Sequence, residues 1–160
     1  MKPRLLLTFL LASALSAALL QGQQLTIETG AGKQIVLTKA EIEALPRTNV
    51  TIGVSDSPDA YVGVSLHALL EKASVSFAES LRGKRLASCL LVEAADGYRV
   101  VFALPEIDPA FGDKQIVLVF LKNGKPLDEK EGPYRIVIPT EHRMARWVRQ
   151  VTTLKVVDVQ

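Results

Sequence analysis

The sequence contains a single cysteine, Cys89, so no disulfide can form within the chain. It also lacks a Gly-rich phosphate loop, a Gly-x-Ser-x-Gly motif, a paired-Cys metal site and a His-Glu-x-x-His motif. Its two histidines, His67 and His142, have no regular spacing and make a weak case for a metal site. The common sequence patterns of hydrolases, nucleotide-binding enzymes and zinc proteins are therefore missing.

A strong charge of either sign is also missing. The chain has 19 Lys and Arg against 17 Asp and Glu, but Lys2 and Arg4 lie in the first 22 residues, where there is no acidic residue. Beyond residue 22 the formal net charge is therefore zero. A neutral, mixed surface gives no support for binding to nucleic acid or to an anionic membrane.

The one long apolar run lies at the N-terminus, where residues 5–20 carry no charge and follow Lys2 and Arg4. A short basic segment followed by an apolar stretch of this length predicts a signal peptide over residues 1–22. The alternative is an uncleaved anchor, but the stretch is short for a membrane span, and no later segment is long enough to form one. We expect a periplasmic or secreted protein, exported by the general secretory route.

Residues 23–160 have the length of one domain with its own core. Alternating apolar residues predict strands at 25–29, 34–37, 49–54, 98–104, 115–121, 134–138 and 154–159. The nearly continuous apolar stretch 86–94 predicts a strand buried on both faces, and residues 55–60 read as a loop.

Helices are expected to be short. Thr38 and Ser65 are positioned to cap helices that end near Pro46 and Lys72, and a further turn is plausible at residues 77–81. Residues 140–148 form either a brief helix or an ordered loop. The turn types favour antiparallel pairing and no β–α–β rhythm appears, so the fold class is α+β and rich in strands.

The basic segment 134–149 offers the best candidate site. Arg143, Arg146 and Arg149 recur every three residues, so a helical turn would place them on one side and build a pocket for an anion. The alternative is a solvated basic face that pairs with acidic neighbours, namely Glu129, Glu131 and Glu141. The spacing alone leaves both interpretations open. For His67, in the predicted helix from Ser65, an ordinary position at the helix surface or at the boundary of the core is favoured.

Five sequence patterns occur in the same order and spacing as in the molybdopterin-binding domain of the sulfite oxidase family. They are Gly-Val-x-Leu-x-x-Leu-Leu at 63–70, Asp-Gly-Tyr at 96–98, Asn-Gly-x-Pro-Leu at 123–127, Gly-Pro-x-Arg-x-Val-x-Pro at 132–139, and Arg-x-x-Arg-Trp-Val at 143–148. Each pattern is weak alone, but together they cover about 100 residues. The chain therefore resembles a small, stand-alone member of that family.

This resemblance implies a molybdenum–pterin cofactor and two-electron or oxygen-atom transfer. Arg143 and Arg146 would then face the cofactor, one at its terminal phosphate and the other at the pterin edge, with His142 beside them. Arg146 stands where the family usually has Lys, which keeps the charge but changes its geometry. Arg135 lies in a matching position, where a structural role is equally compatible.

Two departures from the family pattern point away from catalysis. The family binds molybdenum through a Cys thiolate ahead of the Gly-Val pattern, but residues 46–61 contain no Cys. Cys89 lies later, on an expected core strand, where a buried hydrophobic role is favoured over a thiolate ligand. The family's proteins also normally leave the cytoplasm folded, with a twin-Arg signal, whereas this chain has only Arg4 before its apolar run.

Two hypotheses follow. The first is an exported oxidoreductase that binds molybdopterin, with Cys89 as the thiolate donor. The second is a cofactor-free binding module, in which the groove at residues 143–149 recognises an anionic small molecule or a partner protein, such as a redox partner. The missing Cys favours the second.

Overall fold

The computed structural model describes residues 23–53 and 57–158. The predicted signal peptide lies outside the described residues. The strands are β1 (Leu25–Glu28), β2 (Gln34–Leu37), β3 (Arg47–Ile52), β4 (Asp59–Ser65), β5 (Cys89–Ala94), β6 (Arg99–Ala103), β7 (Val117–Lys122), β8 (Lys125–Pro126), β9 (Arg135–Val137) and β10 (Val151–Val157). The helices are α2 (Lys39–Glu43), α3 (Leu66–Lys72) and α4 (Leu104–Ile107), with 3-10 turns η1 (Ala78–Ser80), η2 (Gly83–Ala87) and η3 (Met144–Arg146).

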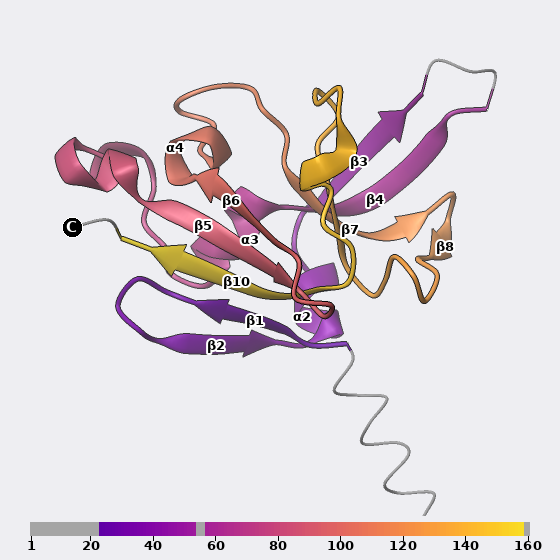
Figure 1. Ribbon diagram of the computed structural model, residues 1–160, viewed down its shortest axis with the longest axis horizontal. Helices are drawn as coiled ribbons and strands as arrows, with labels where there is room; N and C mark the ends of the chain where they lie inside the picture. Colours follow the sequence, from indigo (N-terminus) through magenta and orange to yellow (C-terminus); the bar gives the residue numbers. More distant parts are fainter. Residues whose placement is uncertain (1–22, 54–56, 159–160) are drawn as a thin grey trace, which may run out of the picture.

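Two sheets make up the molecule, and Figure 1 shows them as separate layers. Sheet A has the strand order β2-β1-β10-β5-β6. Its central strand β10 comes from the C-terminal end of the chain and lies beside β1 from the N-terminal end, with Ile27 opposite Leu154 (Figure 1). This β1–β10 pair is parallel, whereas the other pairs of sheet A are antiparallel.

Sheet B has the order β3-β4-β7-β8, and β9 also pairs with β7. All of its pairs are antiparallel. Strand β7 therefore holds β4 on one side and β8 and β9 on the other. The α+β class with mostly antiparallel sheets and short helices is confirmed.

Local capping explains where the helices begin. The Thr38 side chain accepts a hydrogen bond from the Glu41 backbone N–H at 3.3 Å, and the Glu41 carboxylate accepts one from the Thr38 N–H at 2.8 Å, which is the reciprocal capping box. Ser65 ends β4 and caps α3 by accepting from the Ala68 N–H at 3.1 Å. Both predicted caps are confirmed.

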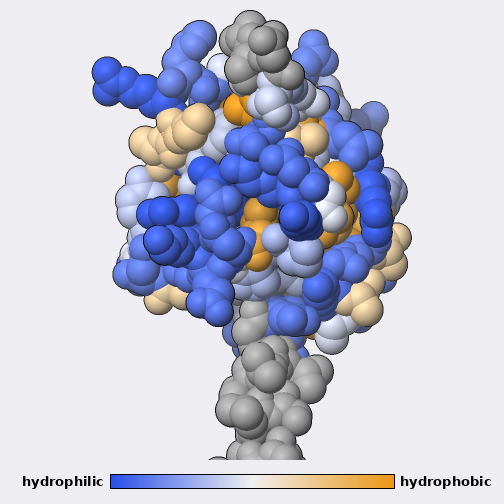
Figure 2. All heavy atoms as spheres, turned by 90° about the vertical axis from the view of Figure 1, so that its right-hand side faces the viewer, coloured by the Kyte–Doolittle hydropathy of each residue, from blue (hydrophilic) through white to orange (hydrophobic). Residues whose placement is uncertain are grey.

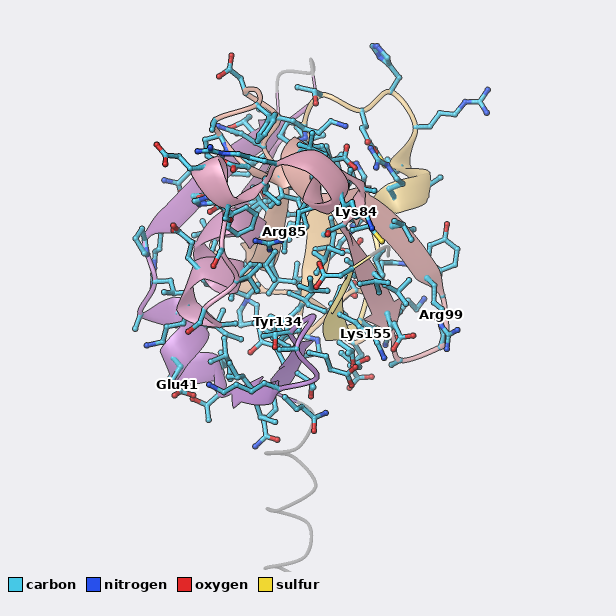
Figure 3. All side chains as sticks on the ribbon, turned by 90° about the vertical axis from the view of Figure 1, so that its left-hand side faces the viewer. Glu41, Lys84, Arg85, Arg99, Tyr134 and Lys155 are labelled. Atoms are coloured by element: carbon cyan, nitrogen blue, oxygen red, sulfur yellow. The ribbon has the colours of Figure 1, made fainter. Side chains whose placement is uncertain are left out.

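The prediction of a doubly buried strand at residues 86–94 is wrong. Residues 86 and 87 belong to η2, and β5 alternates between buried and half-buried side chains from Cys89 onward. One face of sheet A is covered, and the other is open, with Val36 and Val101 about half exposed. In Figure 3, Arg99 and Lys155 lie on this open face, whereas the labelled Tyr134 is fully buried. The doubly buried strand is β7, whose first four residues are all buried.

Other differences concern element boundaries. Strand β4 was missed because Gly63 and the polar residues ahead of it resemble a loop, yet it is the long partner of both β3 and β7. The last strand begins at Val151 rather than at Leu154. Tertiary pairing with β5, and not local propensity, sets that start.

No helix in the described part of the chain is long and apolar enough to cross a membrane. The face seen in Figure 2, on the side of β8 in Figure 1, is mostly hydrophilic with a small hydrophobic area near its centre.

Candidate functional site

The basic segment begins with β9. The rest of the segment then turns back beside β9 before the chain enters β10. The Ile136 N–H donates to the Val148 carbonyl at 2.8 Å, and the Val151 N–H donates to the Tyr134 carbonyl at 2.9 Å. Helical structure is limited to η3, so Arg143 precedes the turn and Arg149 follows it. The expected helical face with all three arginines does not form.

Arg146 is held in a network of four charged side chains, which we call the Arg146 network: Glu106, Lys114, Glu141 and Arg146. Its guanidinium donates to Glu106 Oε1 at 3.1 Å and also to the Glu141 carboxylate. Lys114 Nζ lies 2.9 Å from Glu106 and 3.7 Å from Glu141. The network contains two positive and two negative groups, so its formal charge is zero.

The pKa values within the Arg146 network favour the charged forms. Burial acts to raise the pKa of Glu106, but hydrogen bonds from Lys114 and Arg146 outweigh it and hold this pKa below the ordinary value. Burial acts to lower the pKa of Arg146, but Glu141 and Glu106 raise it above its usual range. The guanidinium also lies 4.7 Å from the ring centroid of Phe102 on β6. Arg146 is thus already paired on its polar side and packed on its flat side.

Cys89 lies on the other face of sheet A from Arg146. The register places Cys89 opposite Ala103, and Leu90 opposite Phe102. Successive residues of a strand point to opposite faces of a sheet, so the Cys89 thiol points away from the face on which Phe102 contacts Arg146. Cys89 is half-buried, and not fully buried as expected.

Arg135 and Trp147 form a buried pair within the basic segment. Arg135 on β9 is 8% exposed and donates to the Glu131 carboxylate, and its guanidinium lies 5.5 Å from the centroid of the Trp147 ring. Trp147 is 5% exposed. Both Arg135 Nε and Trp147 Nε1 are buried and find no hydrogen-bond partner among the residues that the structure describes. Buried polar groups in folded proteins are nearly always hydrogen-bonded. Two neighbouring exceptions therefore single out this region as a candidate binding site.

A cavity of about 350 Å³, which we call the Trp147 cavity, is lined by both of these side chains. Its wall also includes Arg149, and Tyr98 and Met144, which are 49% and 59% exposed. The Tyr98 hydroxyl donates to the Ala145 carbonyl at 2.7 Å and so joins the β5–β6 hairpin to the basic segment. The cavity volume lies in the range of small-molecule sites, about 300–1,000 Å³.

The remaining candidate residues lie apart from this cavity. His142 and Arg143 are exposed and do not line it. His67 lies on α3, with Nδ1 3.4 Å from Glu71 and its ring centroid 4.5 Å from that of Phe77, which agrees with the expected helix-surface position. The described residues hold no cluster of three His, Cys, Asp or Glu side chains suited to a metal ion.

Comparison with known proteins identifies the family. Residues 16–160 match the family described as "Oxidoreductase molybdopterin binding domain". The chain belongs to this family. The structure is similar to a chain of the sulfane dehydrogenase SoxCD from Paracoccus pantotrophus, with a TM-score of 0.65 and 24% sequence identity. The match covers 86% of this chain but only 39% of the SoxCD chain, and it shows a shared fold. No curated protein matches the sequence. The resemblance drawn from the five sequence patterns is confirmed.

The residues of this member do not fit the cofactor that the family name implies. A thiolate donor and a free arginine would have to face the same space, but Cys89 and Arg146 lie on opposite faces of sheet A. Arg146 is also paired with two carboxylates, so it has no uncompensated charge to offer a phosphate. Of the predicted cofactor-binding residues, Arg135 lines the Trp147 cavity, whereas His142, Arg143 and Arg146 do not.

Sequence reasoning missed several residues that shape this site. Trp147 and Tyr98 belong to the family patterns, so their motifs could have directed attention to them. Glu106 and Lys114 carry no sequence signal, because they lie 40 and 32 positions from Arg146 and meet it only through folding. The interpretation of the arginines as residues paired with acidic neighbours is correct for Arg135 with Glu131 and for Arg146 with Glu141.

Proposed function

We propose that this chain is an exported, cofactor-free binding module of the oxidoreductase molybdopterin-binding domain family, and that it holds a small anionic ligand in the Trp147 cavity. Residues 1–22 support export because they combine Lys2 and Arg4 with an uncharged apolar run. The single observation that carries the binding role is the pair of unpartnered N–H groups, Arg135 Nε and Trp147 Nε1.

The energetic argument rests on the cost of buried donors. An N–H that is buried without an acceptor forfeits about 1–3 kcal/mol relative to one that is hydrogen-bonded. A ligand oxygen that accepts from Arg135 Nε and Trp147 Nε1 would recover that free energy. Arg149, exposed at the same cavity, would add attraction for a negative charge.

A molybdenum assay tests the absence of a redox centre. The full chain should be expressed in cells that make molybdopterin and recovered from the exported fraction, and its metal content measured by mass spectrometry. We expect far less than one molybdenum per chain, and Cys89→Ser should leave that value unchanged. Stoichiometric molybdenum that is lost in Cys89→Ser would overturn the cofactor-free proposal.

Trp147 is the only tryptophan, so its fluorescence reports binding directly. Titration with acetate and with inorganic phosphate should change the emission with saturation. Arg149→Gln should weaken that binding by about tenfold to a hundredfold, since a charge-assisted hydrogen bond contributes about 1.5–3 kcal/mol. Arg143→Gln is the matched control, because Arg143 is also exposed but does not line the cavity. Equal effects of the two variants, or no response to either anion, would contradict the site.

A further inference from the structure

The Trp147 cavity also restricts the kind of anion, an inference that rests on the binding role proposed above. Its charged lining consists of Asp96, Glu131, Arg135 and Arg149, which sum to a formal charge of zero. Arg135 is already paired with Glu131, which leaves Arg149 as the cation of the lining that has no ion pair with another described residue. One negative charge on a ligand can pair with Arg149, whereas a second would face the Asp96 carboxylate with no further unpaired cation in the lining.

The two unpartnered donors suit a planar, two-oxygen acceptor. Each contributes one N–H, and the guanidinium of Arg135 lies 5.5 Å from the centroid of the Trp147 ring. A carboxylate has two oxygens and can accept from two separate donors at once. Because both nitrogens are buried, the ligand must move a side chain of the wall to reach them. Met144 and Arg149 are long, exposed side chains of that wall that can move aside and then repack against the bound ligand.

Part of the rim of the Trp147 cavity is apolar. Tyr98 and Met144 are two of the six large hydrophobic side chains that the described part of the chain leaves exposed, and both line this cavity. The Tyr98 ring is held in place by its hydroxyl, which donates to Ala145. Met is unbranched and adapts to varied apolar shapes. An apolar group attached to the carboxylate would therefore cover surface that is exposed in the free chain.

We propose that the ligand class is a monocarboxylate with an apolar body, whose carboxylate binds Arg135 Nε, Trp147 Nε1 and Arg149 while the body packs on Tyr98 and Met144. A chain-terminal carboxylate of a small peptide has this chemistry, as does a free acyl amino acid. A phosphate ester of the same size carries a second negative charge that faces Asp96, so it should bind this lining more weakly than the carboxylate.

The test uses the protein after removal of the predicted signal peptide, that is, residues 23–160. It compares four probes: N-acetyl-leucine, N-acetyl-leucinamide, acetate and butyl phosphate. Trp147 fluorescence measures the dissociation constants. N-acetyl-leucine should bind about tenfold or more tightly than acetate, since the leucine side chain buries apolar surface. It should also bind about tenfold or more tightly than the uncharged amide, which lacks the charge-assisted bonds.

Variants assign the contacts. Trp147→Phe removes the N–H but keeps a ring, and calorimetry should show N-acetyl-leucine binding weakened by about threefold to tenfold. Met144→Ala should weaken N-acetyl-leucine but not acetate, because it removes part of the apolar rim alone. Leu86→Ala removes an exposed leucine outside the cavity and should change neither. Retained far-ultraviolet circular dichroism confirms that each variant is folded.

The outcomes separate this inference from the binding role on which it rests. Tighter binding of butyl phosphate than of N-acetyl-leucine, with the same dependence on Arg149, would overturn the carboxylate class and keep the anion-binding role. Equal binding of N-acetyl-leucine and its amide would overturn the carboxylate class as well. No fluorescence response to any of the four probes would overturn both.

Discussion

Gly63 lies where β4 and β7 approach too closely for a side chain. A Cβ at this position would lie 2.1 Å from the Leu118 carbonyl oxygen and 2.6 Å from the Val119 Cα, which are backbone atoms of a central strand. The pairing of β4 with β7 also shifts its register between Val62 and Gly63. The glycine of the Gly-Val family pattern is therefore required by backbone packing.

Gly63→Ala should lower the free energy of unfolding by about 3 kcal/mol, the upper part of the range for overpacked sites, because backbone has little freedom to move aside. Urea denaturation followed by circular dichroism measures this. Gly112→Ala is the matched control, since a Cβ there meets nothing within 4 Å and its φ is not positive. The control should be neutral or slightly stabilising. A similar loss in both variants would contradict the packing argument.

Glu106 makes the stability of the protein depend on pH. Its folded pKa lies below the ordinary value of 4.5 because Lys114 and Arg146 outweigh the effect of burial. A carboxyl with a lowered folded pKa contributes stability that is fully present above its unfolded pKa and is lost as the pH falls through the folded pKa. The contribution of Glu106 is therefore complete above about pH 5 and declines below about pH 4.5.

Glu106→Gln should reduce the slope of unfolding free energy against pH below about pH 4.5, since glutamine does not titrate. The amide oxygen still accepts from the Ala103 N–H, to which Glu106 is bonded at 3.0 Å, so the start of α4 is preserved. Urea titrations at several pH values measure the slope. Glu79→Gln, at a side chain that is 93% exposed, serves as the comparison and should leave the slope nearly unchanged. The same slope in Glu106→Gln as in the natural protein would contradict this account.

At the scale of the elements, β10, near the C-terminal end of the given sequence, pairs with β1, the first described strand. It lies between β1 and β5 in sheet A, and Leu154 on it is fully buried opposite Ile27 and Val92. The same strand follows directly after the basic segment, so the position of Trp147 depends on β10 being paired on both sides. The strand that completes the sheet also holds the candidate site in place.

Leu154→Ala should cost about 2–5 kcal/mol, as is usual when a fully buried leucine is truncated in a core that cannot collapse around the space. Lys155→Ala on the same strand removes a half-exposed ion pair with Glu28 and should cost less than about 1 kcal/mol. Chemical denaturation, followed by the fluorescence of Trp147, measures both. Equal losses would show that β10 does not depend on its buried face.

At the scale of the whole molecule, the two sheets surround a shared core, but the residues that the structure describes cover only one face of sheet A. The family fold is retained, while Arg146, which the resemblance places at the cofactor, is paired with Glu106 and Glu141 in the Arg146 network. The side chains at the site therefore decide the function of this family member more than its fold does. The Trp147 cavity, whose lining includes Arg135 and Trp147, contains no side chain of the Arg146 network and remains open to a ligand.

The sequence alone determined features that depend on neighbouring residues. The reciprocal cap at Thr38, the cap at Ser65 and the Asp96-Gly97 turn involve groups within a few positions of each other, so local chemistry decides them. The family was also evident, because its five patterns keep their order along the chain. The strand at Asp59–Ser65 was missed because its stability comes from two partner strands and not from its own propensity.

Only the tertiary structure decided which residues make the site. The pairing of Arg146 with Glu106 joins positions 40 residues apart, and the face on which Cys89 lies follows from strand register. The two donors, Arg135 Nε and Trp147 Nε1, lack acceptors because both are buried, and no local sequence pattern predicts that burial. Local interactions select turns and caps, whereas charge pairing and burial depend on contacts that exist only once the chain has folded.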